Sequence, residues 1–378
     1  MAGSVHKDKD SGKWYYMLTL YDENGKRKQK KKRGFKTKGE AKAALSEAET
    51  EVNKGTYIEP SKESFVKYLN DWYEIKVISI PRSAKTTRTI IDKHIIPHFD
   101  DKVTLGNLQL KHVDNFILNM TKHKRNDGKV GYAPATIKRA LDVVKSCLES
   151  AVDNGLIVKN VARKATLPKS TGTEMKIWDE DEIEKFLETA KEDRLYILYY
   201  LALMTGMRQG ELLGLRWKDI DFPNNSLSVK QVLSHDGKQF FPGAKTKKGN
   251  RTISLNTKTT DALKQHKILI ESEKEKHGDG YINNYDLVIC TTIGTPYNPS
   301  NILNRSFKPL IEKAEVTPIR FHDLRHVHAT MLLKLGENPK VISERLGHKD
   351  INTTLRIYSH VLPSMQKQVV EKLDSLNF

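Results

Sequence analysis

One apolar run constrains the fold of this chain more than any other stretch. Residues 195–204 read LYILYYLALM and offer no polar face, so a helix formed there must be buried on almost every side. Gly206 is placed to end that helix. A polar linker, residues 159–176, lies upstream and separates this region from the first part of the chain. The sequence therefore predicts a C-terminal domain large enough to enclose a central helix.

Length and composition limit the class of protein. A chain of 378 residues with 38% hydrophobic residues predicts two or three folded domains. No apolar run approaches the roughly 20 residues of a membrane span, and the N-terminus lacks a signal-peptide core. The two cysteines exclude a disulfide framework and fit a reducing compartment. We therefore expect a cytoplasmic protein that does not contact membranes.

The charge distribution indicates an anionic partner. The formal net charge is +17, and residues 1–170 carry 34 Lys and Arg against 20 Asp and Glu. Residues 171–378 carry 30 against 27, so most of the positive excess lies in the first part. A basic excess of this kind is typical of nucleic-acid-binding proteins.

Residues 1–58 are predicted to form a small sheet with one helix. Trp14 to Tyr21 alternates like a strand, Asn24-Gly25 is a hairpin signal, and Lys26 to Phe35 returns. A capping box at Thr37 and Glu40 starts the helix. Nine basic residues and no acidic one lie between Lys26 and Lys38, which favours DNA contact over a solvated edge strand. The candidate DNA-binding residues on this strand are Lys28, Lys30, Lys32 and Arg33.

Residues 62–165 are predicted to form an all-helical domain. Phe65, Tyr68, Leu69, Trp72 and Tyr73 follow helical spacing and define a core-facing stripe. Further helices follow Thr86, surround Phe116 and begin at Pro134. Four cations lie near predicted helix N-termini, positions that favour phosphate binding, although each could equally be an ordinary surface residue. These candidate DNA contacts are Lys85, Arg88, Lys138 and Arg139.

Residues 174–378 are predicted to form a mainly helical domain with a small sheet. Asp179 and Glu182 cap its first helix. Strand-like alternation covers residues 226–255, and a further strand is expected over Leu287 to Cys290. The predicted helices cover Thr257 to Lys276, Pro299 to Ala314, Asp323 to Leu335, and a segment starting at Pro339. The chain is thus a multidomain protein: a small N-terminal sheet with a helix, an all-α domain, and a mainly α domain.

Chemically capable residues gather in the last domain. His322, Arg325, His348 and Tyr358 lie within about forty residues of each other along the chain. Arg208 follows the buried helix, where packing does not require an arginine, and Glu211 is placed three residues later to orient it. Lys245, Lys247, Lys248 and Arg251 lie near a predicted turn, a pattern typical of a solvated hairpin tip. Cations, imidazoles and a phenol suit a phosphorylated substrate.

Two of these segments carry a family resemblance. The segments T-G-M-R-Q-G-E-L-L-G-L-R-W-K-D-I-D and H-D-L-R-H-V-H-A-T…R-L-G-H-K-D-I-N-T-T-L-R-I-Y-S-H-V resemble the two signature boxes of the tyrosine recombinase (phage integrase) family. The helical middle is similar to that family's core-site-binding domain, and residues 1–58 are similar to its arm-site-binding domain. The resemblance implies Arg208, His322, Arg325 and His348 as active-site groups and Tyr358 as nucleophile. It implies a catalytic lysine on a hairpin turn, Lys245, with Lys247 and Lys248 as alternatives.

The chemistry of these residues agrees with the resemblance. A tyrosine nucleophile can store the phosphodiester energy as a covalent 3′-phosphotyrosine that a DNA hydroxyl later attacks. Arg208 and Arg325 can bind the non-bridging oxygens and replace metal ions, so we expect no metal or nucleotide cofactor. We assign Lys245 as general acid, His322 as donor or base toward Tyr358, and His348 as a donor to a phosphate oxygen.

Three other functions compete with site-specific recombination as explanations of these residues. A zinc hydrolase would use His322 and His326 but lacks an evident third ligand. A DNA-binding regulator would not need Tyr358, and a type IB topoisomerase shares the chemistry and is the nearest alternative. Recombination predicts a homo-tetramer on double-stranded DNA with core and arm sites, DNA-bending accessory proteins, and a bacterial nucleoid location. The segment from Pro363 to Leu376 could dock on a neighbouring protomer or pack on its own core.

Overall fold

A computed structural model describes most of the chain in two compact units, residues 1–172 and 173–378. The described residues are 3–21, 26–54, 57–59, 61–81, 83–125, 128, 130–168, 176–243, 251–348, 350–352, 354–355 and 374. No helix in these ranges is long and apolar enough to cross a membrane.

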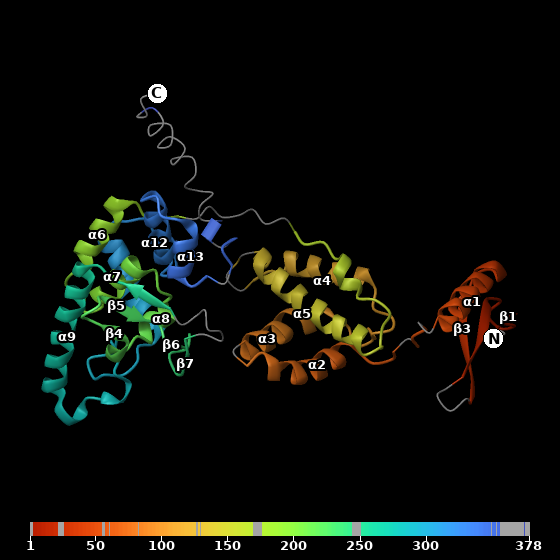
Figure 1. The fold of residues 1–378 in the computed structure, drawn as a ribbon. Helices are drawn as coiled ribbons and strands as arrows, with labels where there is room; N and C mark the ends of the chain where they lie inside the picture. The colour runs from red at the N-terminus through yellow and green to blue at the C-terminus, as the bar shows by residue number, and fades with distance from the viewer. Residues whose placement is uncertain are drawn as a thin grey trace. The chain divides into compact units, whose positions relative to one another are not determined.

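The first unit begins with a three-stranded antiparallel sheet of order β1-β2-β3 and one helix (Figure 1). The elements are β1 (Ser4–Lys7), β2 (Trp14–Tyr21), β3 (Arg27–Phe35) and α1 (Lys38–Asn53). Strands β2 and β3 confirm the predicted hairpin strands, whereas β1 was not predicted; the Asn24-Gly25 turn lies outside the described residues. The Thr37 hydroxyl caps α1 as predicted, but the Glu40 carboxylate accepts from the Lys36 amide rather than from that of Thr37.

Helix α1 packs against one face of this sheet, and the opposite face, which α1 does not contact, is named the open face. Tyr16 and Leu18 of β2 are buried against Leu45 and Ala48 of α1. Residues opposite each other in an antiparallel pair share a face, so the strand register assigns every β3 residue to one side. Lys28, Lys30 and Lys32 pair with Leu20, Leu18 and Tyr16 and belong to the helix-covered face. Arg27, Lys31 and Arg33 pair with Tyr21, Met17 and Tyr15 and belong to the open face.

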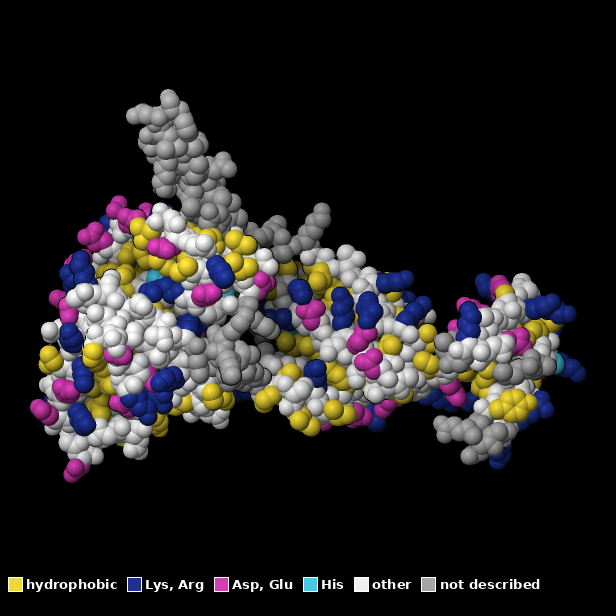
Figure 2. Space-filling view, in the orientation of Figure 1, with side chains coloured by type: hydrophobic (Ala, Val, Ile, Leu, Met, Phe, Trp, Pro, Cys, Tyr) yellow, Lys and Arg dark blue, Asp and Glu magenta, His cyan; other side chains and the backbone are white. Residues whose placement is uncertain are grey.

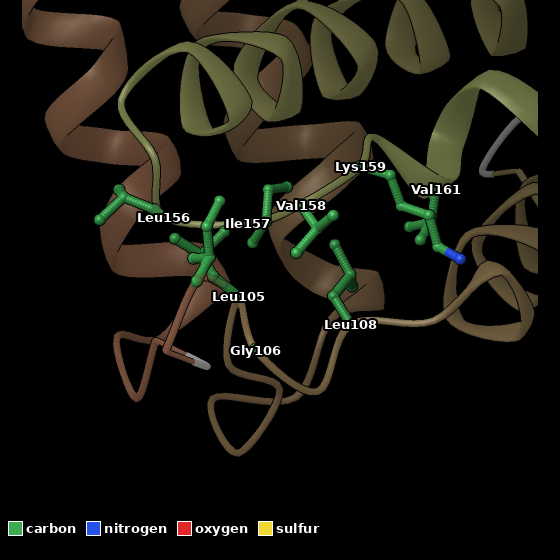
Figure 3. Close-up of a pocket in the computed structure, with 9 residues that line it drawn as sticks. Leu105, Gly106, Leu108, Leu156, Ile157, Val158, Lys159 and Val161 are labelled. Atoms are coloured by element: carbon green, nitrogen blue, oxygen red, sulfur yellow. The ribbon is translucent and has the colours of Figure 1, made fainter. Parts of the chain in front are cut away.

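The rest of the first unit is helical, as predicted. Its elements are α2 (Phe65–Ser79), α3 (Ala84–Ile90), a π turn (Ile91–Ile95), a 3-10 turn (Ile96–His98), α4 (Leu110–Lys122), α5 (Pro134–Asp153) and a second 3-10 turn (Val161–Lys164). All five residues of the predicted α2 stripe are buried, and Pro134 is the first residue of α5. A cavity of about 190 Å³ between the loops 105–108 and 156–161 is lined mainly by apolar side chains such as Leu105, Leu108 and Val158 (Figure 3).

The second unit is built around α7 (Tyr196–Thr205), the predicted apolar helix. Seven of its ten residues are buried, and Gly206 ends it in the left-handed conformation. In Figure 1 the long helix α9 runs along the outside of the unit. Most residues of α7 and α12 are buried, so these two helices belong to its core. The α-helices in the described part of this unit are α6 (Glu180–Ala190), α7, α8 (Gln209–Leu213), α9 (Thr257–His277), α10 (Pro299–Ile302), α11 (Lys308–Lys313), α12 (Asp323–Lys334) and α13 (Pro339–Leu346).

The strands of the second unit are short and form two small sheets. β4 (Ile220–Asp221), β5 (Ser226–Ser228) and β8 (Thr252–Ser254) form one sheet, and β6 (Gln231–Leu233) pairs with β7 (Phe240–Pro242). The predicted strand over Leu287 to Cys290 is wrong. These residues are buried, but only Leu287 makes a bridge, to Arg216, because the segment packs as a core connection rather than beside a second strand. The helix predicted over Pro299 to Ala314 contains a π turn at Leu303–Phe307 between α10 and α11.

Gly206 should tolerate no side chain. Its φ is +63°, and an added Cβ would lie 2.5 Å from Leu346 Cδ2 and 2.6 Å from His328 Cδ2. We expect Gly206→Ala to cost about 1–2 kcal/mol for the left-handed backbone and a further ~1–3 kcal/mol for the forced repacking. Gly336→Ala is the matched control, since Gly336 has φ +83° and no atom within 4 Å of an added Cβ. Equal losses in urea denaturation for both variants would show that the close contact carries no cost.

Candidate active site

Three helix ends meet around Arg325. This arginine lies in the first turn of α12, and its guanidinium is buried. Arg325 Nη1 donates to the Gly206 carbonyl at the end of α7 at 2.7 Å, and Nη2 donates to the Leu346 carbonyl at the end of α13. Arg208, two residues beyond Gly206, donates through Nη2 to the Gly347 carbonyl at 3.2 Å. Residues far apart in the sequence are thereby brought to one place.

Four of the six predicted catalytic residues share this site. Arg208 directly precedes α8, His322 directly precedes α12, Arg325 lies in the first turn of α12, and His348 follows the left-handed Gly347 that ends α13. The charges of Arg208 and Arg325 both act on the two imidazoles, which shows the mutual proximity of the group. Lys245, with its alternatives Lys247 and Lys248, and Tyr358 lie outside the described residues.

Glu211 binds Arg208 as predicted. Its carboxylate accepts from the Arg208 backbone amide at 2.9 Å and from Arg208 Nη1 at 2.8 Å. It also accepts from Arg251 Nη2 at 2.7 Å and Nη1 at 3.2 Å. Burial alone would raise the pKa of Glu211, but the hydrogen bonds and charge of Arg251, together with Arg208, lower it to about 2. Glu211 is therefore a permanent anion shared by two cations.

The positive charge of the site exceeds its described negative charge. Arg208, Arg251 and Arg325 surround the single Glu211 carboxylate, and the partners of Arg325 are uncharged carbonyls. Burial and the charge of Arg208 lower the pKa of Arg325 to about 9, which still leaves it protonated at neutral pH. A bound anion would relieve this repulsion, so the arrangement favours a phosphate.

Both candidate catalytic histidines are neutral at pH 7. Partial burial and the charge of Arg325 lower the pKa of His322. Partial burial and the charges of Arg325 and Arg208 lower the pKa of His348 to about 4. His348 Nδ1 lies 2.8 Å from the Thr354 hydroxyl. When that hydroxyl donates to Nδ1, the proton is carried by Nε2, which can then donate to an oxygen of a substrate.

Sequence reasoning missed two further arginines. Arg251 was expected on a solvated turn, but its side chain is only 7% exposed. The signal was the alternation of Arg251, Ile253 and Leu255, which puts Arg251 on the buried side of β8. Arg345 donates to the Ser254 and Met204 carbonyls at 3.1 Å each and through Nε to His328 Nε2 at 3.3 Å. No motif in the sequence indicated that network.

The predicted DNA-contacting cations of the first unit differ in their ion pairs. Arg88 binds Asp92 and Asn70, and Lys138 binds Asp142 at 2.8 Å. Lys85 and Arg139 are exposed on α3 and α5. On β3, Lys30 pairs with Glu59, and Arg33 lies 3.9 Å from Asp8. Lys and Arg side chains are visible on both units in the view of Figure 2, interspersed with acidic ones.

The zinc-hydrolase alternative finds no support in the described part of the chain. His322 and His326 lie one helical turn apart, with ring centroids 5.3 Å from each other. Across the described residues, no three His, Cys, Asp or Glu side chains come together as metal ligands. The two imidazoles instead share their surroundings with arginines, which repel a cation.

Comparison with known proteins places most of the chain in known families. Residues 176–365 match the phage integrase family, and residues 4–52 match an Arm DNA-binding domain. The chain is 31% identical over 390 residues to a tyrosine recombinase XerC-like protein of Caldanaerobacter subterraneus subsp. tengcongensis, covering 97% of both. It is 30% identical over 305 residues to the ICEBs1 integrase of Bacillus subtilis, covering 80% of both.

Solved structures show the same fold. The Tn1549 transposon integrase in complex with transposon right end DNA has a TM-score of 0.66 and 20% identity, covering 82% of this chain and 100% of that one. A lambda integrase dimer bound to a COC′ core site has a TM-score of 0.59 and 19% identity, covering 78% and 95%. The chain belongs to the phage integrase family. It is a tyrosine recombinase of the integrase type found in mobile elements and phages, which disfavours the topoisomerase alternative.

The buried His328 should make stability depend on pH. Its Nδ1 donates to the Leu203 carbonyl at 2.7 Å while Nε2 accepts from Arg345, and burial lowers its pKa to about 4. The stabilisation is complete above pH 6.5 and is lost as the pH falls toward 4, because the unfolded chain takes up the proton first. Between pH 7 and pH 5 we expect His328 to account for a loss of about 2 kcal/mol.

Urea denaturation across this pH range provides the measurement. His328→Asn, whose amide does not titrate, should flatten the dependence of the unfolding free energy on pH. His235→Asn, at an exposed histidine of the same unit, should leave the wild-type slope unchanged. If His328→Asn keeps the full wild-type slope, the imidazole is not held neutral.

Proposed function

We propose that this recombinase cuts and rejoins double-stranded DNA at specific sites through Tyr358, with Arg208 and Arg325 clamping the scissile phosphate. The observation that carries this proposal is the convergence of Arg208, Arg325, His322 and His348 at three helix ends with an unbalanced positive charge. Two guanidinium groups can bind the non-bridging oxygens and stabilise the charge that develops in the transition state. The proposal therefore needs no metal ion or nucleotide cofactor for this purpose.

The proposed reaction balances within the DNA and the protein. The Tyr358 oxygen attacks phosphorus and loses its proton toward His322, while the bond from phosphorus to the 5′ oxygen breaks. Lys245, or else Lys247 or Lys248, protonates the leaving 5′ oxygen. His348 donates from Nε2 to a phosphate oxygen, consistent with its contact with Thr354. A 5′ hydroxyl of another strand then attacks the 3′-phosphotyrosine and releases Tyr358.

The domain organisation follows from this function. We assign arm-site binding to residues 1–58, core-site binding to the helices of 62–165, and catalysis to 174–378, supported by the arm-domain match and by DNA in the structures of similar integrases. Lys85, Arg88, Lys138 and Arg139 are proposed to contact phosphates from the second domain. Exchange between two duplexes requires four active sites, hence a tetramer on DNA, with DNA-bending proteins as accessory factors at the bacterial nucleoid. The segment 363–376 lies outside the described residues except for Asp374.

The open face of the N-terminal sheet is the better candidate for the DNA groove. A sheet can enter a major groove only through a face that no helix covers. Arg33 meets this condition, together with Arg27 and Lys31, whose ammonium lies 3.6 Å from the centre of the Tyr15 ring. Lys28, Lys30 and Lys32 share the face of α1 and suit contacts with phosphates at the edge of a groove.

Tyr358→Phe should bind site DNA with wild-type affinity and form no covalent adduct. The variant lacks only the hydroxyl that attacks phosphorus. The measurement is adduct formation on a nicked suicide substrate, with Tyr285→Phe as a control that removes an exposed phenol hydroxyl from the same unit. An adduct that persists in Tyr358→Phe would mean that another residue is the nucleophile.

Two charge-matched triple variants test the sheet faces. Arg27→Gln, Lys31→Gln and Arg33→Gln remove three charges from the open face, and Lys28→Gln, Lys30→Gln and Lys32→Gln remove three from the covered face. Both triple variants should lower the slope of the logarithm of the arm-site binding constant against the logarithm of salt concentration. The decrease should correspond to the loss of about three phosphate contacts or fewer. Only the open-face variant should also lose preference for the arm sequence over random DNA, because base edges are read inside the groove. Loss of that preference in the covered-face variant instead would reverse the assignment.

A further inference from the structure

Arg251 occupies an unusual position between the proposed catalytic elements. It directly precedes β8, and the segment before it contains Lys245, Lys247 and Lys248. Its guanidinium binds Glu211 with two hydrogen bonds and donates through Nε to the Arg345 carbonyl in α13 at 2.7 Å. One side chain thus connects β8 with α8, which carries Glu211, and with the last turn of α13, just before His348.

The connection between β8 and α13 runs in both directions. Arg251, at the start of β8, donates to the backbone carbonyl of Arg345. Arg345, in α13, donates to the backbone carbonyl of Ser254, the last residue of β8. The two arginines therefore form a reciprocal pair of hydrogen bonds, in which each guanidinium donates to a backbone carbonyl of the other element.

The end of α13 is also enclosed by arginines. Gly347 has φ +66°, and an added Cβ would lie 3.0 Å from Arg251 Nη1. The Gly347 carbonyl accepts from Arg208, and His348 follows directly. Any displacement of Arg251 would therefore be transmitted to the turn that places His348 and to a partner of Arg208.

Stability alone does not call for a charged residue at this position. Removing two charges from water costs several kcal/mol, and buried ion pairs are often replaceable by apolar residues of similar volume without loss. Because Arg251 also binds Glu211, the charge of this carboxylate is shared between Arg251 and Arg208. Without that second cation, Glu211 would bind Arg208 alone and draw its guanidinium away from the phosphate.

We propose that Arg251 is a positioning residue of the recombinase reaction. It orients Arg208 through Glu211 and His348 through the end of α13, and it fixes the strand that leaves the lysine-bearing segment. The inference rests on the proposed roles of Arg208, His348 and Tyr358. Arg251 itself is assigned no contact with DNA.

Single-turnover cleavage of a nicked suicide substrate at saturating DNA tests this role. A structural defect lowers the amplitude of the adduct, since fewer molecules are folded, whereas misplacement lowers the rate constant. Misplacing a reacting group by about 1 Å costs about 100-fold in rate, so we expect about that loss for Arg251→Met and about 10-fold for Arg251→Lys, with DNA affinity unchanged. Arg251→Lys keeps a cation on Glu211 but loses the forked geometry.

Arg194→Lys is the matched control. Arg194 also forms two hydrogen bonds with a carboxylate, that of Glu273, and donates to a backbone carbonyl, that of Cys290, with a side chain 21% exposed. It should lower thermal stability as Arg251→Lys does and leave the rate constant within about twofold of the wild type. If Arg194→Lys slows cleavage as much as Arg251→Lys does, the positioning role is overturned.

A double variant separates positioning from stability. Arg251→Met with Glu211→Gln removes the buried carboxylate that has lost one of its two cations and should recover thermal stability, while the rate constant stays low because Arg208 is no longer oriented. Recovery of the rate together with stability would show a purely structural role. If the wild-type protein forms no Tyr358 adduct, the proposed function is overturned as well. If the wild type is active and Arg251→Met forms the adduct with the same rate constant, the positioning role alone is overturned.

Discussion

The site depends on a buried cation held by two helix ends. Arg325 donates to the carbonyls of Gly206 and Leu346, at the C-terminal ends of α7 and α13. Helix C-termini carry partial negative charge and unpaired carbonyls, so they stabilise a guanidinium that no acidic side chain neutralises directly. Because most residues of α7 are buried, this contact ties the proposed active site to the core of the unit.

The resulting excess of positive charge explains how this site can bind a phosphate. Glu211 orients Arg208 and Arg251 but neutralises only part of their charge, and the backbone carbonyls that bind Arg325 carry no formal charge. The imidazoles of His322 and His348 remain neutral in this field and can donate or accept protons without adding to the repulsion. A phosphodiester supplies the missing negative charge, and its transition state supplies more.

Local features of this site could be predicted because they depend on short sequence patterns. Gly206 and Gly347 end helices in the left-handed conformation that glycine adopts without cost, and Glu211 lies three residues after Arg208 on the same helix start. The prediction of a strand over Leu287 to Cys290 was wrong because an apolar run indicates burial but does not show whether a partner strand is available. Arg251 was missed because its partners lie 40 and 94 residues away.

The sequence by itself determined the helices, their ends, the buried run 195–204 and the residue types capable of phosphoryl transfer. Periodicity and capping act over a few residues, so they survive without tertiary information. Only the tertiary structure decided which cations share Glu211, which β3 side chains face away from α1, and how Arg325 joins α7 to α13. These outcomes depend on strand register and on contacts between distant segments, where a one-residue shift moves a side chain to the opposite face.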